Sequence, residues 1–185
     1  MNFVIPNTFS ISNRAPPLTE LEGLYNVLQD KNITKNIKSI LEFGCGITSY
    51  LLYSCIKPET YVSFEMFKPC IETVKKNVPN IKFTETDWND LPKQKFDLIM
   101  VDSSTGFPSN KKYLIAKEKT NPYRDDAINF VLENNMSTDN SLFILHDWCH
   151  PREPWRLHRK FLEDKNYKLI FSVPGKFGFG GYRKN

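Results

Sequence analysis

The sequence predicts an α/β fold built on a doubly wound, mostly parallel sheet with helices on both faces. Short apolar segments of strand length alternate with segments of helical periodicity over most of the chain. Only the last two apolar segments are close enough in sequence to form a hairpin, around "PGK". We therefore expect parallel strands, with one antiparallel pair at the C-terminal end.

The expected elements follow in chain order. The first seventeen residues, with Pro6, Pro16 and Pro17, predict an extended arm ahead of a single domain over residues 18–185. A helix should begin at Thr19, a suitable N-cap with Glu22 three residues later. Strands are expected at Ile40–Phe43, Tyr61–Phe64, Ile81–Thr84, Phe96–Val101, Ser141–Leu145, Tyr167–Val173 and Phe177–Arg183. Further helices are expected at Thr48–Cys55, Pro69–Asn77, Arg124–Asn134 and Glu153–Asp164.

The composition is that of one globular domain. The chain has 185 residues, 40% of them hydrophobic and 25% charged, which suffices for a full core. The net charge is +4, but the basic residues are interleaved with acids, so a nucleic-acid partner is not expected. Since the N-terminus does not resemble a signal peptide and no apolar run reaches roughly 20 residues, we expect a cytoplasmic protein without a membrane partner. The four cysteines form no CxxC pair and predict reduced thiols: Cys45, Cys55, Cys70 and Cys149.

Acidic residues stand at the ends of the expected parallel strands. They are Glu42, Glu65, Asp87, Asp102 and Asp147. In open parallel sheets ligands bind beside the carboxyl ends of the strands. Five acids on one rim would repel one another, so stability alone does not explain them. We therefore expect the binding site at this edge.

A glycine pair follows the first strand, in "SILEFGCGITSYLL". Gly44 and Gly46 allow a tight turn and a close approach of the backbone to a ligand. A nicotinamide-binding fold would place a third glycine where this chain has Ser49. A negative pyrophosphate would also be disfavoured beside Glu42, whereas an acidic rim tolerates a positively charged ligand.

The run from Glu42 to Gly46 resembles the first motif of class I S-adenosylmethionine-dependent methyltransferases, E/D-x-G-x-G. The resemblance extends from about Leu18 to the end of the chain. It includes an acid after the second strand, "TDW" after the third, "FDLIMVDS" as the fourth and the C-terminal antiparallel pair. It implies a Rossmann-like, seven-stranded sheet and S-adenosylmethionine as cofactor, with S-adenosylhomocysteine as product. The branch of the family is not identified.

The resemblance also implies the roles of the cofactor residues. Glu42 would lie near the ligand's ammonium group, and Gly44 and Gly46 along its amino acid and ribose. Glu65 would accept both ribose hydroxyls. At the adenine end, Asp87 would accept from the amino group, and Trp88 or Met66 would cover the ring. Asp102 would border the same crevice. The alternatives are that Glu65 and Asp87 cap the helices that follow, and that Trp88 and Met66 are core residues.

The stretch "LHDWCHPREPWRLH" after the fifth strand lies where such enzymes contact the methyl acceptor. The predicted catalytic residues are His146, Asp147 and Asp102. His146 could be a base oriented by a carboxylate. Alternatively, Asp102, Asp147 and a histidine could bind a divalent metal, but the usual Asp-Asn pair is absent because Trp148 follows Asp147, so no metal ligand is predicted. A third possibility is that His146 and Asp147 only brace the loop.

The predicted function is methyl transfer to an oxygen or nitrogen of a small-molecule acceptor. The alternatives are a nicotinamide-dependent oxidoreductase and a non-catalytic module that binds a nucleotide or S-adenosylmethionine. The arm and the long connection from Ser103 to Tyr123 are expected to border the acceptor pocket. The sequence does not predict the oligomeric state.

Overall fold

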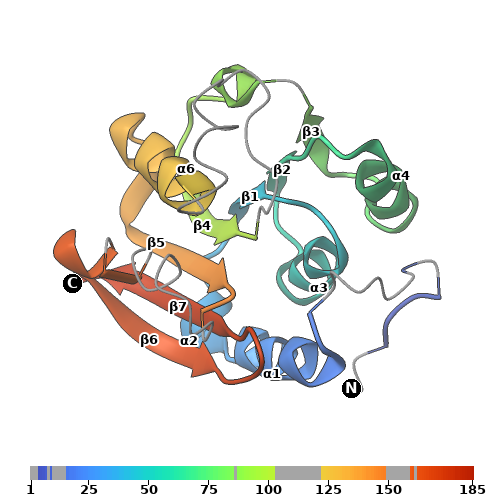
Figure 1. Cartoon of the computed structure of the whole chain (residues 1–185), viewed down its shortest axis with the longest axis horizontal. Helices are drawn as coiled ribbons and strands as arrows, with labels where there is room; N and C mark the ends of the chain where they lie inside the picture. The colour runs from blue at the N-terminus through green and yellow to red at the C-terminus, as the bar shows by residue number, and fades with distance from the viewer. Residues whose placement is uncertain are drawn as a thin grey trace.

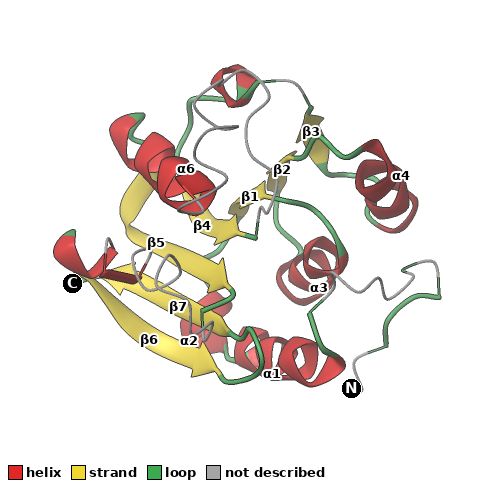
Figure 2. Cartoon of the chain, in the orientation of Figure 1, coloured by secondary structure: helices red, strands yellow, loops and turns green. Residues whose placement is uncertain are grey.

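The computed structural model describes residues 4–7, 9, 16–85, 87–102, 122–148, 159–160 and 162–185, with side chains from residue 126 onward in the helix that begins at Pro122. The described strands form one seven-stranded sheet in the order β3-β2-β1-β4-β5-β7-β6. Figure 2 shows the sheet in yellow between helices in red. The strands are β1 (Ser39–Phe43), β2 (Thr60–Phe64), β3 (Lys82–Thr84), β4 (Phe96–Val101), β5 (Ser137–His146), β6 (Tyr167–Val173) and β7 (Phe179–Lys184).

Strands β1 to β5 pair in parallel, and β7 pairs antiparallel with both β5 and β6. The order starts in the middle with β1, runs outward to β3, and then returns through β4 to the C-terminal pair. The predicted fold class is therefore confirmed: a doubly wound, mostly parallel seven-stranded sheet with an antiparallel pair at one edge.

Helices cover both faces of the sheet (Figure 1). The described helices are α1 (Leu18–Gln29), α2 (Lys31–Thr34), α3 (Ile47–Ile56), α4 (Lys68–Asn77), the 3₁₀ turn η1 (Trp88–Asp90) and α6 (Pro122–Glu133). One core lies between the sheet and α1, α3 and α4, and the other lies between the sheet and α6. Successive residues of β4 point into opposite cores: Leu98 and Met100 into the first, Ile99 and Val101 into the second.

The first helix differs from its prediction. It begins at Leu18 with Pro17 as N-cap and no side-chain cap, so the proposed capping role of Thr19 and Glu22 is wrong. Proline suits this place because its fixed φ matches a helix start and its missing N–H needs no partner there. The acidic residue in the first turn is Glu20, and its side chain is fully buried.

The last strand also starts later than predicted. Strand β7 begins at Phe179, because the backbone N–H groups of Phe177 and Gly178 are bound by the carboxylate of Glu20. Strand β5 begins earlier than predicted, at Ser137, and α2 was not predicted. Residues 159, 160 and 162–164 are helical, and the rest of the predicted helix from Glu153 lies outside the described residues.

Cys45, Cys55 and Cys70 are in the reduced form, and Cys149 lies outside the described residues. Burial raises the pKa of the Cys45 thiol, which stays protonated at neutral pH. In the described part of the chain no helix has the length and apolar character that crossing a bilayer requires.

Candidate active site at the carboxyl edge of the sheet

The carboxyl ends of β1, β2, β4 and β5 lie side by side at one edge (Figure 1). Backbone hydrogen bonds continue beyond the strands: Gly44 N donates to Phe64 O at 2.9 Å, and Asp102 N donates to Phe43 O at 2.9 Å. The residues just after the strands are therefore fixed by the sheet. This places the glycine pair, Glu65 and Asp102 at neighbouring positions, as expected for residues that follow parallel strands of one sheet.

The glycine loop leaves open space beside the chain. Gly44 has φ 90°, in the left-handed region that favours glycine. Gly46 is the N-cap of α3, and a Cβ built on it would have no atom within 4 Å. A ligand can thus approach the backbone closely at Gly46.

Glu42 is fully buried beneath this loop, with three hydroxyl groups around its carboxylate. Ser49 donates to it at 2.6 Å, Tyr61 at 3.1 Å and Thr48 at 3.3 Å. Desolvation raises the pKa of Glu42 to about 8, although these hydroxyl groups and their hydrogen bonds act in the opposite direction. The carboxyl group therefore carries little charge at neutral pH, and its hydrogen bonds are to the first turn of α3 and to β2.

Ser49 connects the glycine loop to Glu42. Its hydroxyl accepts from Gly46 N at 3.0 Å while it donates to Glu42. The residue that replaces the third glycine of a dinucleotide motif therefore links the loop to Glu42 from the first turn of α3. Thr48, Ser49 and Tyr61 were not among the predicted site residues; the hydroxyl pair that begins two residues after Gly46 was the signal for the first two.

Glu65 ties the loop to the start of α4. Its Oε2 accepts from Cys45 N at 3.2 Å, and its Oε1 accepts from Met66 N and Phe67 N, each at 2.7 Å. A carboxylate offers about four lone-pair sites, so these three donors leave about one. The side chain is buried, and it binds the two N–H groups just before α4, whose N-cap Phe67 has no side-chain cap.

Two of the residues predicted for the adenine end, Asp87 and Trp88, lie at η1. Asp87 caps this turn by accepting from the backbone and side chain of Asn89 at 2.9 and 3.0 Å. Trp88 stacks on Phe130, with ring centroids 5.0 Å apart and planes within 5°. Trp88 and Met66 are partly buried and pack against the second core. The structure therefore shows Asp87 in a capping role and Trp88 and Met66 in packing roles.

His146, at the end of β5, contacts the end of β4. Its Nδ1 lies 2.5 Å from Oδ1 of Asp102 and 3.8 Å from Oδ1 of Asp147. Its Nε2 lies 3.9 Å from Oε2 of Glu20, which sequence analysis did not select. His146 also stacks on Phe179 with ring centroids 4.7 Å apart. The structure thus groups the three predicted catalytic residues and adds a fourth acid from α1.

No group of three His, Cys, Asp or Glu side chains suited to a metal ion occurs in the part of the chain that the structure describes. Ser103 lies outside that part, as do these residues of the quoted stretches "TDW" and "LHDWCHPREPWRLH": Thr86, His150, Arg152, Arg156 and His158. Most of the connection between β4 and α6 also lies outside it.

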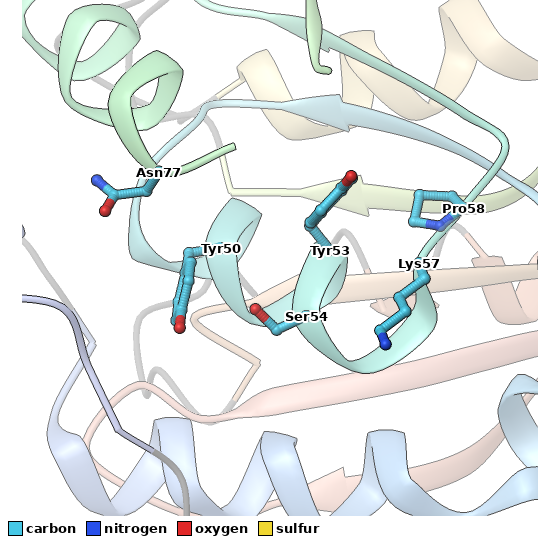
Figure 3. Close-up of a pocket in the computed structure, with 6 residues that line it drawn as sticks. All are labelled: Tyr50, Tyr53, Ser54, Lys57, Pro58 and Asn77. Atoms are coloured by element: carbon cyan, nitrogen blue, oxygen red, sulfur yellow. The ribbon is translucent and has the colours of Figure 1, made fainter. Parts of the chain in front are cut away.

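A shallow hollow of about 420 Å³ lies elsewhere, on the outer side of α3 (Figure 3). Its lining includes Tyr50, Tyr53 and Asn77, and it ends at Lys57 and Pro58, which lead into the amino end of β2. The predicted site residues are at the opposite end of the strands, so this hollow is separate from the site.

Solved structures share this fold. The S-adenosylhomocysteine-bound methyltransferase PaMTH1 from Podospora anserina matches with 16% identity and a TM-score of 0.61, over 94% of this chain and 81% of that one. The tRNA methyltransferase TrmK from B. subtilis matches with 14% identity and a TM-score of 0.54, over 96% and 68%. The O-methyltransferase TomG from Streptomyces achromogenes, involved in tomaymycin synthesis and in complex with S-adenosylmethionine, matches with 16% identity and a TM-score of 0.51, over 96% and 82%. The sequence matches neither a protein-family model nor a curated protein.

Proposed function

Because the chain has the fold of class I S-adenosylmethionine-dependent methyltransferases, we propose that it transfers a methyl group from this cofactor to an oxygen or nitrogen of a small molecule. The observation that carries the proposal is the open backbone at Gly46, next to the left-handed Gly44, at the carboxyl edge of the sheet. A cofactor that runs along this edge needs that open space.

The residues present fit this cofactor. Gly44 and Gly46 would line its amino acid and ribose, and Oε2 of Glu65 has one acceptor position for a ribose hydroxyl. A second hydroxyl at Glu65 would have to displace a backbone N–H. Asp87, Trp88 and Met66 would lie at the adenine end, and all three side chains are only partly buried. Glu42 would act through Ser49 and the loop.

Asp102, His146 and Asp147 would form the acceptor end. S-Adenosylmethionine supplies a methyl group on a positively charged sulfur, so the protein's main task is alignment of the acceptor. An oxygen or nitrogen acceptor also loses a proton. The side chains of Asp102 and Asp147 are 18% and 16% exposed, against 6% for His146, so the two carboxylates are more accessible to an acceptor than the histidine is.

The likeness to TomG supports a small-molecule acceptor, whereas TrmK shows that the same fold also serves tRNA. The acidic rim favours the former here, because phosphate groups would be repelled by Glu65, Asp102 and Asp147. Methyl-transfer assays with tRNA and with proteins would detect either of them as an acceptor.

A nicotinamide cofactor is the alternative. The expected repulsion between a pyrophosphate and Glu42 is weak, because the raised pKa of this group leaves it mostly neutral at pH 7. The argument against this cofactor is instead the fully buried Ser49, which occupies the position of the third glycine and is hydrogen-bonded on both sides.

Calorimetry tests the cofactor. We expect the chain to bind S-adenosylmethionine and S-adenosylhomocysteine and not NAD. Glu65→Gln should weaken binding by about 1.5–3 kcal/mol, roughly 10- to 150-fold, because it removes a charged acceptor. Glu72→Gln, at an exposed position on α4, is the matched control and should bind as the wild type does.

Binding of NAD alone would contradict the proposal. Equal affinity in Glu65→Gln would remove the ribose role of Glu65. Transfer of a labelled methyl group to a panel of small molecules, tRNA and proteins then identifies the acceptor class. Binding without transfer to any of them would favour the non-catalytic module.

A further inference from the structure

Helix α1 brings a buried carboxylate to the acceptor end of the site. Glu20 lies in the first turn of α1, and its side chain is only 1% exposed. Its Oε1 accepts from Phe177 N at 3.0 Å, and its Oε2 accepts from Gly178 N at 2.8 Å. Oε2 also lies 3.9 Å from Nε2 of His146. A buried carboxylate is costly unless such partners surround it, so Glu20 is held at a defined place.

The turn between β6 and β7 is shaped around this carboxylate. A Cβ built on Gly175 would lie 2.3 Å from Oε1 of Glu20 and 2.4 Å from its Cγ. The turn can therefore wrap around Glu20 only because residue 175 has no side chain. Glu20 and Gly178 are 158 residues apart, so the first helix and the last hairpin meet at this carboxylate.

His146 lies between carboxylates that approach both of its ring nitrogens. Asp102 lies 2.5 Å from Nδ1, Asp147 lies 3.8 Å from Nδ1, and Glu20 lies 3.9 Å from Nε2. A neutral imidazole has one N–H and one lone pair. In the neutral form the lone pair would point at a carboxylate inside the protein. A proton on each nitrogen replaces this repulsion with attraction.

We propose that Glu20 is a positioning residue of the methyl-transfer site: together with Asp102 it holds His146 as a doubly protonated imidazolium, and His146 in turn fixes Asp102 toward the acceptor. This inference rests on the proposed function. The side chain of Asp102 is the most exposed of the three, at 18%, against 6% for His146 and 1% for Glu20. The order Glu20–His146–Asp102 thus leads from the buried hairpin turn toward solvent.

The arrangement changes the role of the histidine. An imidazolium has no lone pair and cannot take a proton, so His146 is not the base. The carboxylate of Asp102 takes that role: as the acceptor atom bonds to the methyl carbon and the sulfur–carbon bond breaks, the acceptor's proton passes to Asp102. The sulfur leaves as a neutral thioether. His146 offsets the negative charge of Asp102 before transfer.

Nitrogen NMR on the whole chain tests the inference without an acceptor. The imidazole nitrogens of ¹⁵N-labelled protein report how many protons the ring carries, and His146→Gln identifies the signals of His146. We expect the His146 ring of the wild type to keep both protons from pH 5.5 to pH 8. In the urea-unfolded chain it should titrate as an ordinary histidine within that range.

Two variants weaken the interaction between Glu20 and His146 in different ways. Glu20→Gln removes its charge, and Gly175→Ala pushes the carboxylate away while leaving it in the chain. In both, the ring should lose its second proton at a pH about one unit lower than in the wild type or more. Glu22→Gln, at an exposed position on the same helix, should behave as the wild type does. A Glu20→Gln variant that fails to fold leaves Gly175→Ala as the deciding variant.

Two results would overturn the inference. One is a wild-type ring that is neutral at pH 7. The other is an unchanged protonation of His146 in the folded Glu20→Gln and Gly175→Ala variants, which would show that Glu20 only holds the hairpin turn. Calorimetry with S-adenosylmethionine separates this result from a failure of the proposed function, because it reports cofactor binding independently of the ring.

Discussion

Glu42 shows how burial sets the chemistry of one side chain. It is fully buried among Ser49, Thr48 and Tyr61, and desolvation outweighs their hydrogen bonds in raising its pKa to about 8. The hydroxyl groups can donate to the carboxyl oxygens in either protonation state. Glu42 is therefore a mostly neutral hydrogen-bonding group under the loop at neutral pH, and its titration should influence stability.

The sign of this influence follows from proton linkage. The pKa of Glu42 is about 8 in the folded chain, against 4.5 for the ordinary group. Between these values the folded chain keeps a proton that the unfolded chain has lost, so the free energy of unfolding falls as pH rises, by about 1.4 kcal/mol per pH unit. The contribution is complete below pH 4.5 and lost above pH 8.

Urea unfolding at pH 5.5 and pH 7.5 measures this effect. From the first pH to the second, the wild type should lose about 2–3 kcal/mol relative to Glu42→Gln, which cannot titrate. Glu72→Gln, at an exposed position on α4, should keep the wild-type dependence. Parallel pH dependence in the wild type and Glu42→Gln would show that Glu42 is ionised in the folded chain throughout this range.

At the scale of elements, α1 packs so closely on β6 that it needs a glycine. A Cβ built on Gly23 would lie 2.4 Å from Cγ1 of Val173. Glycine inside a helix is unfavourable by roughly 0.5–1 kcal/mol relative to alanine. The close packing on β6 that requires Gly23 also brings Glu20 to the hairpin turn.

The contact predicts a coupled pair of substitutions. Gly23→Ala should destabilise the chain by about 1–3 kcal/mol, because overpacking exceeds the gain in helix propensity. In the Val173→Ala background the same substitution should be neutral or stabilising, since the clashing methyl group is gone. Urea unfolding of the four proteins gives the coupling free energy. A stabilising Gly23→Ala in the wild-type background would mean that Val173 moves aside at little cost.

At the scale of the whole molecule, the first long helix and the C-terminal hairpin pack against each other. Helix α1 packs against the first core and β6, and the C-terminal hairpin extends the sheet beyond β5 (Figure 1). The central strands β1 and β4 lie between two cores and carry fully buried side chains: Ile40, Leu41, Phe43, Leu98, Ile99, Met100 and Val101. Strand β3, at the other edge, is short and partly exposed.

Hydrogen exchange should reflect this organisation. Amides of β1 and β4 should exchange slowest and those of β3 fastest among the strands, because local opening is easiest at an edge. Saturating S-adenosylhomocysteine should slow exchange at residues 43–49 and 65–67 and leave the edge strand β6 unchanged. NAD at the same concentration is the control. Slowing confined to β6, or no slowing with bound ligand, would place the ligand elsewhere.

Much of the fold follows from local sequence. Apolar runs such as that of β4 are most stable inside a sheet covered on both faces, so the existence of the strands and their succession along the chain were predictable. The acids after these runs had to meet at one edge because parallel strands end together. Gly44 indicated the loop because its left-handed backbone favours glycine, and Gly46 because the absence of a side chain leaves the space beside it open.

The remaining features depended on contacts between distant parts of the chain. Glu20 is one of two acids near the start of α1, and only the hairpin turn 158 residues away distinguishes it from the exposed Glu22. The late start of β7 has the same cause, since Glu20 takes the N–H groups that would otherwise extend the strand. A dinucleotide-binding motif would have a glycine at the position of Ser49, whereas in the structure Ser49 is hydrogen-bonded to Gly46 and to Glu42. Sequence therefore determined which groups reach the carboxyl edge, and tertiary structure decided their partners, because hydrogen bonds and desolvation depend on what packs beside each group and not on its neighbours in the chain.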